Sequence, residues 1–222
     1  MKRLLRENGL SLVVFGLFFG SFILGQLLFG WADYNSDRKE HGEPAITVPR
    51  YLVSGHFLEA TMENWESEFL QMGVYVILTA FLYQKGSAES KSLSETEPVD
   101  RDPRRFKNKV HAPWPVRRGG WVLRLYEHSL SLAFLLLFLT SMLLHAVGGR
   151  SVYNEEQTLH GQPTVDLLGY MGSSRFWFES FQNWQSEFLA IGSMVVLSIF
   201  LRQRGSPESK PVDSPHWQTG SE

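Results

Sequence analysis

The chain has 222 residues and a formal net charge of −2, from 21 lysines and arginines against 23 aspartates and glutamates, so its charge does not favour nucleic-acid binding. It has no cysteine, which excludes disulfides, iron–sulfur clusters, thiolate zinc sites and cysteine nucleophiles. The charged residues are unevenly spread, because four segments contain none: residues 9–31, 69–83, 129–149 and 188–201. This pattern predicts an all-α, polytopic membrane protein with polar loops.

The first apolar segment follows Lys2 and Arg3, an arrangement that is also typical of secretory signal peptides. Two features favour a membrane helix instead. The segment has no small-x-small cleavage site, and an equivalent segment occurs in mid-chain, where no signal peptide can lie. We therefore expect a transmembrane helix over residues 8–31.

An internal repeat organises the rest of the chain. Residues 34–91 align with residues 153–210, and 25 of the 58 aligned positions are identical, where chance gives about one in twenty. Each repeat contains one long apolar segment, a polar loop and one short apolar segment. The fold class we expect is therefore four transmembrane helices from two parallel two-helix repeats, over residues 8–31, 57–84, 127–148 and 176–203.

The repeat also predicts the domain organisation. We expect a first two-helix membrane repeat over residues 1–91 and a second over residues 121–210. Residues 92–120, which are rich in serine, glutamate, proline and arginine, should form a flexible cytoplasmic linker, and residues 211–222 a disordered C-terminal tail.

The distribution of positive charge predicts the orientation, since lysine and arginine beside membrane helices are retained in the cytoplasm. Sixteen basic residues precede the first segment, separate the second from the third or follow the fourth, whereas the two repeat loops hold five. We therefore expect both termini in the cytoplasm and both repeat loops on the outward side.

The second and fourth apolar segments are too short to cross a hydrocarbon layer of about 30 Å at about 1.5 Å per residue. The repeated Asn-Trp-x-Ser-Glu motif should complete each span. Asn64 and Glu68 lie four residues apart, as do Asn183 and Glu187, so each pair shares a helical face. Two roles stay open for the paired acids: a structural hydrogen bond to the opposing half, or a cation or proton site.

Two histidines occupy matching His-Gly-x-Pro turns. His41 and His160 could each bond to the backbone of a turn. Alternatively, they could meet beside Glu68 and Glu187 and bind a divalent metal such as zinc, nickel or manganese. Their spacing matches no established metal motif, so the metal is unknown.

The third apolar segment carries His128 and His145, which could ligate haem in a small cytochrome b-like bundle. The repeat aligns them with Asn8 and Gln26, so both haem ligands would have to come from one half of the chain. We therefore expect no cofactor.

Tryptophans flank the short apolar segments. Trp65, Trp177 and Trp184 are predicted to be aromatic membrane anchors at the level of the lipid headgroups, in preference to ligand-stacking residues.

Two motifs occur once in each half of the chain. They are Asn-Trp-x-Ser-Glu-Phe-Leu, which begins at Asn64 and Asn183, and Gly-Ser-x-Glu-Ser-Lys, which begins at Gly86 and Gly205. With these doubled motifs the chain resembles an uncharacterised bacterial family of four-helix integral membrane proteins. The resemblance covers nearly the whole chain. It implies a bacterial inner-membrane location and no particular mechanism.

No phosphate-binding loop or catalytic triad pattern is present, so no catalytic residue is predicted. We rank first a non-enzymatic envelope protein that binds or scaffolds a partner through its outward loops. A small cation or proton transporter or channel comes second, favoured by the parallel repeats and an acidic outer surface. An enzyme or a haem- or metal-binding membrane protein comes third. The expected partners are the lipid bilayer and a second copy of the chain or another membrane protein.

Overall fold

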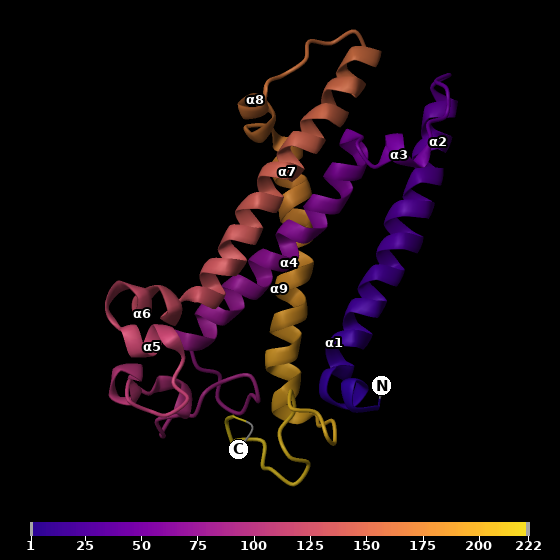
Figure 1. Cartoon of the computed structure of the whole chain (residues 1–222). Helices are drawn as coiled ribbons and strands as arrows, with labels where there is room; N and C mark the ends of the chain where they lie inside the picture. The colour runs from indigo at the N-terminus through magenta and orange to yellow at the C-terminus, as the bar shows by residue number, and fades with distance from the viewer. Residues whose placement is uncertain (1, 221–222) are drawn as a thin grey trace. The chain divides into compact units, whose positions relative to one another are not determined.

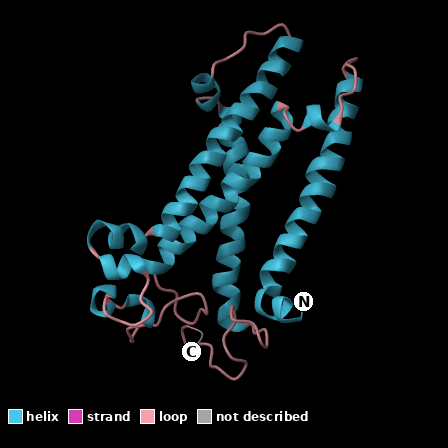
Figure 2. Ribbon diagram, in the orientation of Figure 1, coloured by secondary structure: helices cyan, strands magenta, loops and turns pink. Residues whose placement is uncertain are grey.

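The computed structural model describes residues 2–220, with side chains from Leu5 onward. All regular secondary structure in that range is helical (Figure 2), which confirms the all-α class. Met1 of the expected first repeat and Ser221 and Glu222 of the expected tail lie outside the described residues.

Long helices account for most of the described chain (Figure 1). α1 continues through a π-helical stretch, Phe22–Phe29, into α2. The α-helices are α1 (Lys2–Ser21), α2 (Gly30–Glu40), α3 (Val48–Tyr51), α4 (Gly55–Phe81), α5 (Trp114–Arg118), α6 (Gly120–Glu127), α7 (Ser129–Leu159), α8 (Leu167–Met171) and α9 (Ser174–Phe200).

Two helical stretches are long and apolar enough to cross a membrane. They are Leu5–Glu40 and Ser129–Leu159, which contain the first and third expected spans. α4 and α9 contain the second and fourth apolar segments, but acidic residues occupy the first half of each helix. Length and composition therefore support two of the four expected membrane helices directly.

The chain divides into two compact units, each made of two separate parts of the sequence. Unit 1 comprises Met1–Trp65 and Ser141–Glu179, and unit 2 comprises Glu66–Thr140 and Ser180–Glu222. Unit 1 therefore contains both repeat loops, and unit 2 contains the expected linker and tail.

The core of unit 1 forms where α7, α8 and α9 meet. Ala146, Tyr170 and Phe176 are fully buried there, one from each helix. On the same stretch of α7, Gly148 permits close packing against α4: a Cβ at this position would lie 2.5 Å from the backbone nitrogen of Glu59. This close approach brings polar side chains of α4 next to α7.

Each repeat loop of unit 1 is closed by an asparagine. The Asn35 side chain accepts a bond from Ile46 N at 2.7 Å and donates to Ile46 O at 3.0 Å. Asn154, which the repeat aligns with Asn35, makes the same two bonds to Val165, at 2.8 and 2.9 Å. The aligned asparagines therefore fix the two loops in the same way.

In unit 2, residues 210–220 bind to the first Gly-Ser-x-Glu-Ser-Lys motif, an arrangement that we call the C-terminal clasp. The Lys210 ammonium group, only 1% exposed, donates to the carbonyl oxygens of Gly86, His216 and Gln218. Gly220 N donates to Ser87 O at 3.0 Å. The described part of the expected tail is thus hydrogen-bonded to the end of the first repeat.

The segment expected to be a linker, residues 92–120, contains local helical structure. Two 3₁₀ turns, Pro98–Asp100 and Pro103–Phe106, precede α5. Ala112 and Val116 form a small apolar cluster with Leu123 of α6.

Candidate functional site

Unit 1 has a polar groove of about 710 Å³ formed by residues of both repeat loops and the helix ends beside them. It contains both histidines singled out from the sequence, His41 and His160. We call it the loop groove, and its charged and histidine lining consists of Asp37, Arg38, His41, Glu43, His56, Arg150, Glu155, Glu156 and His160.

The two histidines make equivalent bonds to the last turns of the helices that precede them. His41 Nδ1 lies 2.9 Å from Asp37 O, and His160 Nδ1 lies 2.8 Å from Glu156 O. Both rings are exposed beside the ends of α2 and α7. In this arrangement each histidine satisfies a carbonyl oxygen of the last helical turn, while its Nε2 atom stays available to a ligand.

A second group of ionisable side chains lies deeper in unit 1. Glu59 of α4, His145 of α7 and Glu179 of α9 each offer a ligand atom, and these atoms all lie within 4.8 Å of one another. Glu59 is 8% exposed and His145 is fully buried, whereas Glu179 is half-buried. We call these three residues the buried cluster.

Glu179 is held from three directions. Tyr170 Oη donates to its Oε2 atom at 2.8 Å, and Arg175 Nε donates to its Oε1 atom at 2.9 Å. His145 Nε2 lies 3.6 Å from Oε2. Burial is the main cause that raises the pKa of Tyr170, and the hydrogen bond to Glu179 raises it further. The phenol therefore remains a neutral donor at physiological pH.

Arg175 connects the buried cluster with the loop groove. Its guanidinium group pairs with Glu179 and also with Glu156, which lines the groove. The same group lies 5.8 Å from the centre of the Tyr153 ring, which limits its orientation. A continuous row of charged groups therefore runs from the groove to the cluster.

Glu59 contributes an unsatisfied oxygen to the cluster. Its Oε1 atom is buried, and it has no hydrogen-bond partner among the described residues. A buried carboxylate oxygen without a partner is costly, because it has lost its hydration without replacement. Glu59 therefore brings an unsatisfied acceptor to a carboxylate that lies beside His145 and Glu179.

A combination of one imidazole and two carboxylates supports two kinds of chemistry. It can coordinate a transition-metal ion, since imidazole nitrogen and carboxylate oxygen are both common ligands. It can also hold and pass on a proton, since imidazole and carboxylate groups both accept and release protons.

Sequence reasoning missed Glu59 and Glu179, although it considered His145 as a haem ligand. In the 119-residue alignment, Glu59 is paired with a phenylalanine and Glu179 with an alanine. A search for polar residues shared by both halves therefore passes over them. The available signal was a mismatch between the halves. Each half has one acid in this part of its helix, but Glu179 aligns with position 60, next to Glu59.

The paired motif residues lie elsewhere. Asn64 is exposed and donates to Ala60 O at 2.8 Å, and Glu68 is also exposed. Asn183 and Glu187 are partly buried in unit 2, and Glu68 lies near enough to Glu187 for their charges to repel. His41 and His160 belong to unit 1, whereas Glu68 and Glu187 belong to unit 2.

The three tryptophans all make aromatic contacts within their own unit. Trp65 lies 6.0 Å from Phe18, and Trp177 lies 5.4 Å from Phe176. Trp184 donates from its indole nitrogen to Glu66 at 3.2 Å. Trp184 thus combines ring contacts with Phe138 and Phe181 with a polar bond to Glu66.

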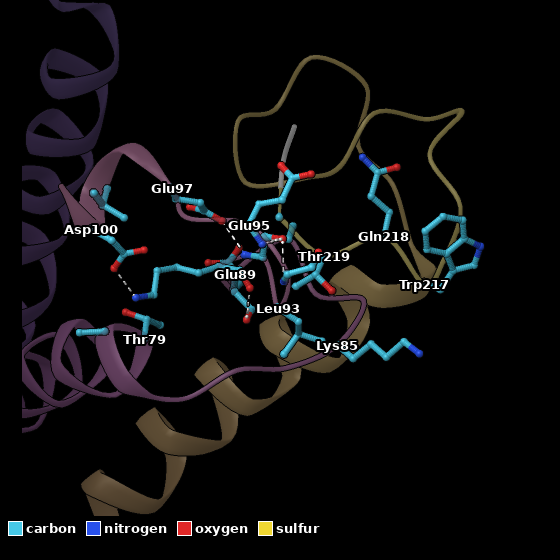
Figure 3. A pocket seen from close by; sticks show the side chains of 18 of the residues that line it. Thr79, Lys85, Glu89, Leu93, Glu95, Glu97, Asp100, Trp217, Gln218 and Thr219 are labelled. Carbon is cyan, nitrogen blue, oxygen red and sulfur yellow. Dashed lines mark hydrogen bonds and ion pairs between the residues drawn. The ribbon is translucent and has the colours of Figure 1, made fainter.

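Unit 2 contains a larger pocket of about 950 Å³ between residues 76–100 and 217–220 (Figure 3). Several of its polar groups already bind one another. Lys91 pairs with Asp100 at 2.7 Å, and Glu97 accepts a bond from Ser92 N. This pocket is therefore a weaker candidate for ligand binding than the loop groove with its buried cluster.

A family model described as a domain of unknown function, DUF6766, matches residues 1–221. The chain belongs to this family. None of the curated proteins and none of the solved structures compared with the chain matches it. Family membership adds no activity, so function has to be argued from the two candidate sites in unit 1.

Proposed function

We propose that the chain is a multi-pass protein of the bacterial cytoplasmic membrane that binds a cationic ligand on its outward side without catalysing a reaction. The four spans are those expected from the sequence, with both termini in the cytoplasm. The excess of basic residues outside the repeat loops supports this orientation. The two long apolar stretches support the membrane location.

The observation that carries the binding role is the loop groove. Residues of both repeat loops line it, and they contribute four carboxylates, from Asp37, Glu43, Glu155 and Glu156, against two guanidinium groups. Arg38 pairs with Glu43, and Arg175 pairs with Glu156, so two of these acids are neutralised. Asp37, Glu155 and the Arg150 guanidinium group provide the remaining charge. The remaining negative potential favours a ligand with one or more amino groups.

Topology is tested first, with single cysteines in this cysteine-free chain. Thr158→Cys lies in a repeat loop, and Ser94→Cys lies in the expected linker; both positions are exposed. A membrane-impermeant maleimide should label Thr158→Cys in intact cells and should label Ser94→Cys only after permeabilisation. Labelling of Ser94→Cys in intact cells would overturn the orientation.

Ligand binding is tested with a linear polyamine as the probe and the purified full chain in detergent. Binding should weaken with salt, and it should fall at least threefold in Asp37→Asn and in Glu155→Gln. Glu95→Gln, in the pocket of unit 2, is the matched control and should bind like the unaltered chain. Equal binding by all three variants would contradict a role for the loop groove.

A second candidate function is transport of protons or cations. The observation in its favour is the row of charged groups from Glu156 through Arg175 and Glu179 to the buried His145. Reconstitution into liposomes containing a pH-sensitive dye tests it: Glu59→Gln should abolish a proton flux that the unaltered chain supports. If Glu59→Gln left the proton flux unchanged, transport would not depend on the buried cluster.

A further inference from the structure

We propose that Glu59, His145 and Glu179 form a binding site for one divalent first-row transition-metal ion, with zinc as the representative ion. The site lies outside the loop groove, and the inference depends neither on polyamine binding there nor on transport. The argument rests on three features of the buried cluster: its geometry, its unsatisfied acceptor and its support by the surrounding side chains.

The geometry is close to that of a formed site. Zinc binds imidazole nitrogen and carboxylate oxygen at about 2.0–2.2 Å, which places ligand atoms about 3.3–3.6 Å apart in a tetrahedron. His145 Nε2 and Glu179 Oε2 are already 3.6 Å apart, and all three ligand atoms lie within 4.8 Å. If side-chain rotations moved the ligand atoms by about 1 Å, three-ligand coordination would be complete.

The unsatisfied acceptor provides a reason for a cation to bind. Glu59 is more than nine-tenths buried, and its Oε1 atom has no hydrogen-bond partner among residues 2–220. Arg175 is shared between Glu179 and Glu156, so it offsets only part of the negative charge. A divalent ion would neutralise Glu59 and Glu179 together and would give the open oxygen a ligand.

The surrounding residues hold the ligands in place, as outer-sphere partners do in metal sites. Tyr170 and Arg175 bind different oxygens of Glu179 and fix the plane of its carboxylate. The Phe176 ring lies 5.0 Å from the imidazole of His145. The three ligands come from three long helices, which position side chains more rigidly than loops do.

The ligand types define the class of metal. An imidazole nitrogen beside two carboxylates favours zinc, manganese, iron or nickel over magnesium and calcium, which prefer all-oxygen coordination. Three protein ligands would leave at least one coordination position for water or for a ligand group.

The test uses the full chain, purified without a histidine tag and stripped with a chelator. Zinc binding is measured by competition with a fluorescent chelator. We expect one zinc ion per chain, unaffected by millimolar magnesium. Glu59→Gln, His145→Gln and Glu179→Gln should each weaken binding at least tenfold. Glu68→Gln and His128→Gln are the matched controls, at exposed residues of the same types, and should bind zinc like the unaltered chain.

Three results would overturn the proposal: no stoichiometric binding to the unaltered chain, equal binding by all cluster variants, or loss of binding in Glu68→Gln or His128→Gln instead. Cobalt substitution in the unaltered chain provides a measurement that does not require any variant to fold. Bound cobalt should give visible absorption bands of a low-symmetry nitrogen and oxygen site, and the spectrum of hexa-aqua cobalt alone would contradict the site. Neither the control variants nor the cobalt measurement alters a residue of the loop groove. The zinc result can therefore be interpreted even if polyamine does not bind.

Discussion

Gly148→Ala should test the packing that brings Glu59 next to α7. The added Cβ would lie 2.5 Å from Glu59 N, 2.9 Å from Gly55 O and 3.0 Å from Glu59 Cα. These are backbone atoms, which cannot rotate away. Ordinary contact begins near 3.5 Å, so α4 and α7 would have to separate by about 1 Å. Overpacking of this kind costs about 1–3 kcal/mol. This cost exceeds the gain in helix propensity from alanine, which is at most about 1 kcal/mol.

The matched control is Gly192→Ala in α9, where a Cβ would meet no other atom within 4 Å. Thermal unfolding in detergent should show a lower midpoint for Gly148→Ala, by about 2–4 °C for each kcal/mol lost in a chain of this size. Gly192→Ala should unfold at or slightly above the midpoint of the unaltered chain. Equal midpoints for Gly148→Ala and Gly192→Ala would refute the close packing of α4 against α7.

Three further predictions concern single side chains. Asn154→Ala and Asn35→Ala should each lower the free energy of unfolding by about 1–3 kcal/mol, because each removes two side-chain bonds to the loop backbone, although Ile46 O keeps its bond from Trp31 Nε1. Chemical denaturation measures this, and a difference of more than about 2 kcal/mol between the two variants would contradict equivalent loops. Lys210→Met should release the C-terminal clasp, so chymotrypsin should cleave after residue 217 faster than in the unaltered chain. Lys91→Met, at a partly exposed lysine, is the control and should leave the cleavage rate unchanged. Equal cleavage rates for the two variants would contradict the clasp. Because burial and a hydrogen bond raise the pKa of Tyr170, the stability that depends on its proton is complete below about pH 10 and is lost as the pH rises through the folded-state pKa. Unfolding measured between about pH 8 and 12 should show a steeper loss of stability in the unaltered chain than in Tyr170→Phe, and equal slopes would contradict this role of Tyr170.

Apolar patterning predicts the positions of the long helices better than their lengths. The sequence predicts the third span over residues 127–148, but α7 continues to Leu159. Counting apolar residues measures the part of a helix suited to a membrane, whereas backbone hydrogen bonding continues through a polar sequence. What ends the helix is the His-Gly turn, where Gly161 adopts a φ of 65° that other residues rarely take. The turn itself was recognised from the sequence.

The buried cluster shows what repeat-based reasoning leaves out. An internal repeat directs attention to residues that both halves share, such as the paired motif acids Glu68 and Glu187. His145 is aligned with Gln26 in the first half, and neither buried acid has an acidic counterpart in the other half at its aligned position. The proximity of these three side chains depends on the helix rotations and on the close packing of α4 against α7. Neither can be read from the spacing of residues within one repeat.

The C-terminal clasp has a consequence for biosynthesis. Lys210 bonds to Gly86 across 124 residues of sequence, so the partner of the first repeat emerges from the ribosome long after that repeat has been made. At about 5–20 residues per second, the delay is about 6–25 s. During this interval the carbonyl groups of Gly86 and Ser87 lack the bonds that Lys210 and Gly220 later donate to them. A nascent chain therefore completes this end of the first repeat only when residues 210–220 have been translated, and a chain truncated before Lys210 cannot complete it at all.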